Sequence, residues 1–138
     1  MKIALGKLLV VENRNNNVLV VRFKTRDLRP FLDDYVDMPD CELFLELQEY
    51  ALADFAPGNC LVLNLAPVEM VNTAVLRFLL LVRKIVRERN GFLVLCHVRD
   101  EHLEILWITQ TLQLFFLAAT EEEAIRKFWM AAEPSSTQ

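Results

Sequence analysis

Apolar residues along this chain occur in two patterns, short unbroken runs and runs with helical spacing. Residues 60–65 (CLVLNL) form an unbroken run between turn-forming residues at 57–59 and 66–67, which is typical of a strand buried on both faces. Further on, apolar residues recur at intervals of three and four, and a helix would place them on one arc facing the sheet: Val75, Phe78, Leu79, Val82 and Val86. The segment 60–89 therefore predicts a buried strand, a loop and an amphipathic helix.

The other apolar runs extend this alternation along the chain. The expected elements are, in order, strands over 7–13 and 18–23, a helix over about 41–55, the strand and helix described above, a strand over 92–98, a helix from 99–100 to 107–110, a strand near 114–117 and a last helix. Polar residues 12–17 predict the turn of the first hairpin. Residues 24–40, with two prolines and five aspartates, predict an irregular connection with one short helical turn.

Residues at the expected helix ends support these boundaries. Asp40 can cap the helix that follows it, and Thr120, with Glu123 three residues later, can cap the last helix. Asn90-Gly91 predicts the end of the central helix, because glycine accepts the left-handed conformation that ends a helix.

The order of the expected elements predicts the fold class. Strands and helices alternate after residue 59, which indicates right-handed crossovers and parallel strands, whereas the first hairpin is antiparallel. We expect an α/β protein with a mixed sheet and about four helices, mostly packed on one face. Since no linker divides the chain, we expect a single domain over 1–132 and a disordered tail over 133–138.

A hydroxyl group lies at the start of the predicted central helix, on Thr73. A helix N-terminus has unsatisfied N–H donors and a partial positive charge, which favour a phosphate added at this position. Arg77 lies one turn further on the same face and could pair with that phosphate. Leu80 and Lys84 continue the same line along the helix. These residues predict a phosphorylation switch.

The same residues also allow a purely structural interpretation. Asn and Thr are both preferred helix N-caps, and such a cap contributes about 1 kcal/mol to stability. Between Arg77 and Arg89 five basic residues stand against one acidic residue, a cationic helix face that either docks a partner or is simply solvated. The sequence leaves both alternatives open.

The order of the segments resembles that of the STAS domains of bacterial anti-sigma-factor antagonists. The resemblance covers most of the chain and includes the strand pair, the strand CLVLNL, the loop ending in Asn72-Thr73, the long helix and the strand FLVLCHV. The stretch EHLEILWITQTLQLFFLAATEEEAIRKF is similar to the third helix, final strand and C-terminal helix of that family. The resemblance implies the mixed sheet expected above.

In that family a tetrad of Asp, Ser or Thr, a small residue and Gly precedes the helix, and a partner kinase phosphorylates its hydroxyl. Thr73 and Ala74 match this tetrad. Asn72 stands in place of the Asp, Asn64 in place of a frequent Asp at the end of the preceding strand, and Val75 in place of the Gly. We expect Val75 to fill space where a partner backbone would approach.

The resemblance implies a non-enzymatic regulatory domain, an anti-sigma-factor antagonist or stressosome-like protein of bacterial type. Its expected partners are a serine/threonine kinase or an anti-sigma factor, and Thr73 is the expected phosphorylation site. The residues expected to bind the partner are Asn72, Thr73, Ala74, Arg77, Leu80 and Lys84.

Composition supports an alternative in the same fold. Hydrophobic residues make up 54% of the chain, which indicates a thoroughly buried sheet or an oligomer interface. The domain would then be a constitutive scaffold, a homo-oligomer subunit, for example a homodimer, or the soluble component of a transport complex. No apolar run approaches the roughly 20 residues of a membrane span, and the first residues do not resemble a signal peptide, so we expect a cytoplasmic protein. The net charge of −4 argues against nucleic acid as the partner.

Residues for catalysis are few. The two histidines, His97 and His102, and the neighbouring Cys96 invite a metal or nucleophile interpretation, but adjacent strand residues point to opposite faces, which keeps Cys96 and His97 apart. Three cysteines without close spacing do not indicate a disulfide framework, and three glycines form no phosphate-binding loop. We expect no enzyme activity, metal or cofactor.

Overall fold

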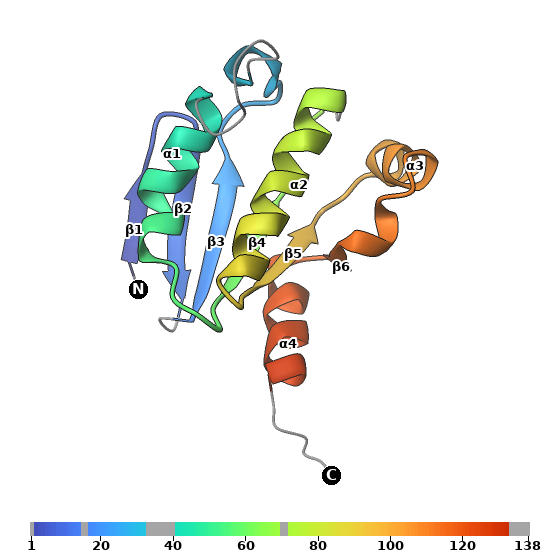
Figure 1. The fold of residues 1–138 in the computed structure, drawn as a ribbon. Coiled ribbons are helices and arrows are strands. Elements are labelled where there is room, and N and C mark those ends of the chain that lie inside the picture. Colours follow the sequence, from blue (N-terminus) through green and yellow to red (C-terminus); the bar gives the residue numbers. More distant parts are fainter. Residues whose placement is uncertain (1, 15–16, 33–40, 70–71, 133–138) are drawn as a thin grey trace.

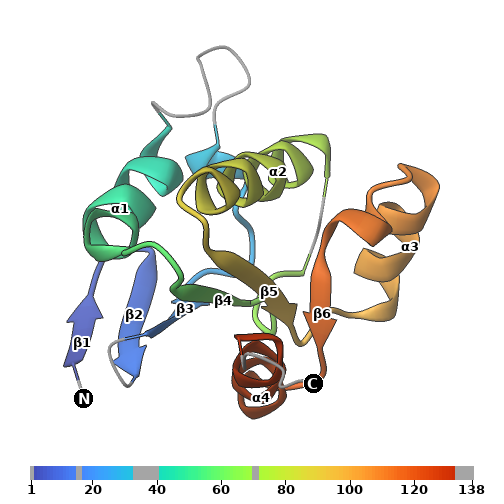
Figure 2. The same ribbon diagram turned by 60° about the horizontal axis from the view of Figure 1, so that its bottom comes forward.

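The computed structural model describes residues 2–14, 17–32, 41–69 and 72–132, which form a mixed sheet with helices on both faces (Figures 1 and 2). The strands are β1 (Lys2–Leu5), β2 (Leu9–Arg14), β3 (Val18–Phe23), β4 (Cys60–Asn64), β5 (Phe92–Cys96) and β6 (Phe116–Ala118). The helices are α1 (Glu42–Tyr50), α2 (Thr73–Glu88), α3 (Asp100–Ile108) and α4 (Glu121–Ala132), with short 3-10 turns at Arg29–Phe31, Leu52–Asp54 and Leu112–Leu114.

The six strands lie in the order in which they follow along the chain. β1, β2 and β3 are antiparallel to one another, and β3 through β6 are parallel. The mixed sheet and the four helices confirm the predicted fold class. β1 was not predicted, because in this edge strand Ile3 and Leu5 are exposed and it therefore lacks the signal of a buried run.

Successive side chains of the parallel strands point to opposite faces of the sheet, and they contribute to a hydrophobic core on each face. Leu61 and Leu63 of β4 face α1 and α2, whereas Cys60 and Val62 face α4 on the opposite side of the sheet (Figure 2). All four side chains are fully buried, which confirms β4 as a strand covered on both faces. The predicted apolar arc of α2 is likewise buried: Val75, Phe78, Leu79, Val82 and Val86.

The end of α2 differs in detail from the prediction. Asn90, not Gly91, takes the left-handed conformation, with φ of 57°. The Gly91 N–H donates to the Val86 carbonyl at 2.9 Å and the Asn90 N–H to the Arg87 carbonyl at 2.9 Å, which is the Schellman arrangement. Gly91 is required for space instead, since a Cβ there would overlap the ring of Phe55.

Several predicted boundaries shift by a few residues. The helix expected over 41–55 divides into α1 and the 3-10 turn after it, and Cys41 is its N-cap residue without a side-chain cap bond. Arg29–Phe31 is the short helical turn expected within 24–40. Asp40, the rest of that connection from residue 33 and the tail from residue 133 lie outside the described residues.

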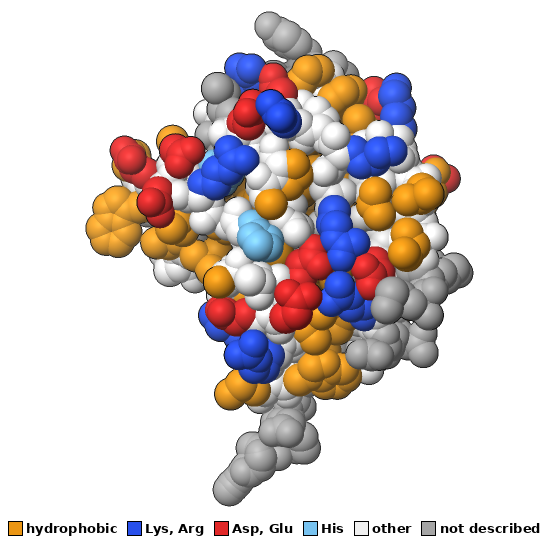
Figure 3. All heavy atoms as spheres, turned by 180° about the vertical axis from the view of Figure 1, so that it is seen from behind, with side chains coloured by type: hydrophobic (Ala, Val, Ile, Leu, Met, Phe, Trp, Pro, Cys, Tyr) orange, Lys and Arg blue, Asp and Glu red, His pale blue; other side chains and the backbone are white. Residues whose placement is uncertain are grey.

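A cluster of charged side chains lies where the first turn of α4 meets the sheet, near the middle of the face in Figure 3. Arg22 of β3 donates to both carboxylate oxygens of Glu121, at 2.7 and 2.8 Å, and to Glu12 of β2 at 2.9 Å. Arg14 donates to Glu12 at 2.7 Å and lies 3.4 Å from Glu121. Glu12 and Glu121 are 5% and 7% exposed. The cluster therefore holds α4 on the sheet by largely desolvated charge pairs.

We expect Glu121→Gln to lower the free energy of unfolding by about 2 kcal/mol, because Arg22 then loses one of its two charged partners, in a partly buried site. The hydrogen bond from Arg22 holds the pKa of Glu121 below its ordinary value of 4.5. The contribution of this carboxylate is therefore complete above that ordinary value and is lost as the pH falls through the lower folded-state pKa. Urea denaturation of both proteins at neutral and acid pH measures the effect.

Glu42→Gln is the matched control. Glu42 pairs with Lys7 at 3.3 Å, but both side chains are exposed, so its loss should change the free energy of unfolding by only a few tenths of a kcal/mol. Equal losses in the two variants, or a loss from Glu121→Gln that persists undiminished in acid, would contradict the buried pairing.

Candidate functional site at the start of the central helix

At the start of α2, the N-cap and the exposed hydroxyl belong to two different residues. The Val75 N–H donates to Oδ1 of Asn72 at 2.9 Å, which makes Asn72 the N-cap. Thr73 is the first helical residue and is exposed. The cap therefore does not depend on the Thr73 hydroxyl, which lies on the surface at the positive end of the helix dipole.

The residues predicted to face a partner are only partly on the surface. Thr73, Arg77 and Lys84 are exposed, and Leu80 is half-buried. Ala74 is only 4% exposed and packs in the core, so its side chain is not available to a partner. The difference arises because Ala74 lies one residue on from Thr73, about 100° around the helix and toward the sheet.

Val75 also lies elsewhere than expected. Its side chain is completely buried between α2 and the sheet, so it does not fill space in front of the helix. The β-branched residue at this position thus contributes to the core, and the expectation of a steric block to a partner backbone is wrong.

The basic residues of α2 divide into two groups. Arg83 donates from Nε to the Leu114 carbonyl at 2.6 Å, and Arg89 donates to the Leu52 carbonyl, so both connect α2 to neighbouring segments. Lys84 and Arg87 are exposed, as is Arg77 near the start. The cationic face therefore contains two arginines that connect α2 to neighbouring segments and three basic residues whose side chains are exposed.

The loop before α2 is tied to its neighbours by hydrogen bonds. The Ala66 N–H donates to Asn64 Oδ1 at 2.8 Å, and Arg99 Nη2 donates to the Ala66 carbonyl at 2.7 Å. Further on, the Glu69 N–H donates to the Arg26 carbonyl at 2.9 Å. The described part of the loop is thus anchored on the connections after β3 and after β5.

Asn64 links this loop to α4. While its Oδ1 accepts from Ala66, its Nδ2 donates to Glu121 at 2.7 Å. A carboxylate at position 64 would place two negative charges at that distance, so an amide suits this position. The charge cluster explains why an Asn stands here, a reason that the local sequence did not reveal.

The histidines and cysteines do not form a catalytic arrangement. Burial raises the pKa of Cys96 to about 12, whereas His97 is exposed beyond the end of the strand. His102 is buried, which lowers its pKa, and its Nδ1 accepts from the Arg99 N–H at 3.4 Å. Within the described ranges, no group of three His, Cys, Asp or Glu side chains could hold a metal ion.

The family model of the STAS domain matches residues 40–124, more than half of the chain. The chain belongs to the STAS domain family. None of the helices in the described part of the chain is long and apolar enough to cross a membrane.

Several solved structures share the fold of this STAS domain, and two of them show the degree of similarity. An anti-sigma-factor antagonist (STAS) domain protein from Planctomyces limnophilus is 20% identical, with a TM-score of 0.63 over 88% of this chain and 97% of that one. A protein from Thermotoga maritima, described as a proposed anti-sigma factor antagonist, is 15% identical, with a TM-score of 0.63 over 86% of this chain and 92% of that one. No curated protein matches the sequence significantly.

Stability measurements can distinguish the contribution of the Asn72 cap from that of the Thr73 hydroxyl. We expect Asn72→Ala to lower the free energy of unfolding by about 1 kcal/mol, because it leaves the Val75 N–H without its acceptor. Thr73→Ala should change it by only a few tenths of a kcal/mol, since Thr73 is exposed and does not supply the cap. Thermal and urea unfolding of both variants test this order, and a larger loss from Thr73→Ala would show that Thr73 is the structural residue.

We expect Asn64→Asp to destabilise the fold by about 2 kcal/mol, because the new carboxylate would face Glu121 in a site that is half-buried. Glu121→Gln in the same chain should recover part of this loss, since an amide can donate to the new carboxylate. A double-mutant cycle measures the coupling. Strictly additive effects would mean that the two side chains do not interact.

Proposed function

We propose that this STAS domain is a non-enzymatic regulatory protein-interaction domain, an anti-sigma-factor antagonist or stressosome-like protein of the cytoplasm. The observation that carries the proposal is the exposed Thr73 hydroxyl at the first position of α2, beside a cap supplied by Asn72. A serine/threonine kinase or an anti-sigma factor is the partner, and Thr73 accepts the phosphate.

Phosphate on Thr73 would act by electrostatics. It places about two negative charges at the positive end of the α2 dipole. Asn72 satisfies the cap without a carboxylate, so no neighbouring negative charge at that position opposes the phosphate. Arg77, one turn on and exposed, lies within reach of a pairing at the i+4 spacing. The modified surface would repel a partner that binds the unmodified form.

The partner surface on α2 consists of Thr73, Arg77, Leu80 and Lys84, with Asn72 at its edge. Its character is cationic around one half-buried apolar residue. A partner with an acidic, apolar-centred face complements it.

A constitutive scaffold or homo-oligomer subunit, or the soluble component of a transport complex, is the second candidate. Its support is the large apolar side chains exposed on three elements: Ile3 and Leu5 on β1, Trp107 and Ile108 on α3, and Trp129 and Met130 on α4. Large apolar side chains exposed at several places offer contact points for other subunits or partners. In this alternative Asn72 and Thr73 only form the start of α2, and Thr73 is not a phosphorylation site.

Mass spectrometry of the protein purified from its native cells under phosphatase inhibition distinguishes the two candidates. We expect peptide mapping to place a phosphate on Thr73 and none on Thr109, another exposed threonine, whose hydroxyl donates to the Ile105 carbonyl at 2.8 Å. Thr73→Ala should lose the modification. Its absence from Thr73 under growth and stress conditions would favour the scaffold.

Affinity for the kinase or anti-sigma factor gives the second readout. We expect Thr73→Glu to weaken binding at least about tenfold and Thr73→Ala to bind like the wild type, because only the former adds a charge. Lys84→Glu should also weaken binding, and because Lys84 is exposed the variant should remain folded. Equal affinities of Thr73→Ala and Thr73→Glu would exclude the switch.

A further inference from the structure

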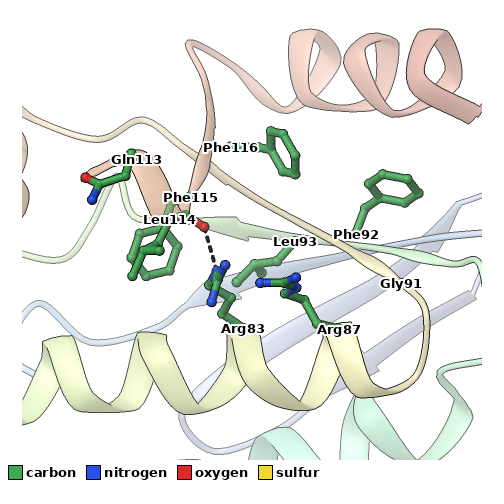
Figure 4. Close-up of a pocket in the computed structure, with 9 residues that line it drawn as sticks. All are labelled: Arg83, Arg87, Gly91, Phe92, Leu93, Gln113, Leu114, Phe115 and Phe116. Carbon is green, nitrogen blue, oxygen red and sulfur yellow. Dashed lines mark hydrogen bonds between the residues drawn. The ribbon is translucent and has the colours of Figure 1, made fainter. Parts of the chain in front are cut away.

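A pocket with a volume of about 360 Å³ lies between the C-terminal half of α2 and the start of β6 (Figure 4). Its cationic side is formed by Arg83 and Arg87, and its apolar side by Leu93 and Phe115, with Gln113 and Leu114 beside them. It lies roughly 20 Å along α2 from Thr73, since the helix rises 1.5 Å per residue. It is therefore separate from the phosphorylation site proposed above.

The charge of this pocket is one-sided. The hydrogen bond from Arg83 Nε to the Leu114 carbonyl, drawn in Figure 4, fixes that guanidinium beside the pocket. The side chain of Arg87 is exposed, and its guanidinium group forms no hydrogen bond or ion pair with residues in the described part of the chain. No acidic residue is among the lining residues, although the protein as a whole has a net charge of −4. Two guanidinium groups beside an apolar wall suit a carboxylate.

The opposite side of β6 has a different surface. There a groove of about 340 Å³ is lined by apolar side chains of β5, β6 and α4, among them Val94, Phe116 and Phe128. Phe116 is 63% exposed. Since both hollows are lined by Phe92, Phe115 and Phe116, they adjoin the same short strand from its two faces.

β6 is the last strand of the sheet and pairs only with β5 among the described strands. Lys127 donates from Nζ to the Leu117 carbonyl at 2.6 Å, and a lysine at this place is typical of an edge strand protected from unselective pairing. The same ammonium group lies 3.4 Å from a carboxylate oxygen of Glu123, so its charge is already paired, and the preference for an acidic segment comes from Arg83 and Arg87.

We infer that the β6 edge binds an extended segment of a protein partner in which an acidic residue alternates with apolar ones. Successive side chains of an extended strand point to opposite faces, so the carboxylate enters the pocket at Arg83 and Arg87 while its neighbours enter the groove at Phe116. The inference rests on the proposed function only in that the domain binds proteins. The segment would be a second anchor, independent of phosphate on Thr73.

Titration of the ¹⁵N-labelled protein with short capped peptides tests this assignment. The probe is acetyl-Gly-Val-Asp-Val-Gly-amide, and the matched peptide carries Asn in place of Asp. We expect amide shifts to change at residues 91–93 and 113–118, and the Asp peptide to bind at least about tenfold more tightly than the Asn peptide, because its hydrogen bonds are charge-assisted.

Arg87→Gln should remove this preference for Asp, and its exposed side chain makes the variant safe for folding. Arg126→Gln is the matched control, because it replaces the same residue type at an exposed position of α4 that lines neither the pocket nor the groove. Arg126→Gln should leave the peptide affinity unchanged. Equal affinity for the Asp and Asn peptides, or an equal loss from both variants, would overturn the inference.

Acetate alone is titrated in parallel. If acetate reproduces the shifts of the Asp peptide with the same affinity, the pocket is a site for free anions and the strand-pairing inference fails. Neither result depends on Thr73, whose phosphorylation is scored separately by mass. If the Asp peptide binds but Thr73 carries no phosphate, the result supports this site and counts against the switch. If Thr73 is phosphorylated but the Asp peptide does not bind, the result supports the switch and overturns this inference.

Discussion

Burial of β4 on both faces is the constraint on which the rest of the structure depends. A strand whose side chains are fully buried above and below needs covering elements on each side, and here α1 and α2 cover one face while α4 covers the other. The parallel pairing of β3, β4 and β5 then places the carboxyl ends of these strands at the same end of the sheet. The loop that leads to Thr73 starts at this end.

The polar residue at the end of β4 connects the two halves of the molecule. Asn64 is bonded to the backbone of the loop on one side and to Glu121 of α4 on the other. Glu121 in turn belongs to the cluster with Arg22 and Glu12. The loop before α2 and the first turn of α4 are therefore connected through one amide side chain.

The long central helix provides two different surfaces. Its start presents an exposed hydroxyl with Arg77 one turn on, and its end, with Arg83 and Arg87, forms one wall of a pocket beside the edge strand. The apolar arc between them is buried, so the helix is held rigidly on the sheet. This arrangement suits an interaction domain, because the two surfaces keep a fixed spacing whichever partner is bound.

Local patterns in the sequence predicted much of the fold. Unbroken apolar runs identified β2 to β5, helical spacing identified the buried arc of α2, and Thr120 was predicted as a cap, confirmed by the Glu123 N–H that donates to its hydroxyl at 3.1 Å. Each of these signals depends on neighbours within a few residues. β1 escaped prediction because its pairing partner, not its own burial, makes it a strand.

The sequence by itself determined the alternation of strands and helices, the family resemblance and the position of Thr73 at the start of a helix. Only the tertiary structure decided that Asn72 is the cap, that Ala74 and Val75 are buried, and that Asn64 is paired with a carboxylate 57 positions later. It also decided that two arginines of α2 share a pocket with residues after position 90. The reason is physical: periodicity along a chain fixes which way a side chain points within its own element, but its partners across the sheet depend on how the elements pack.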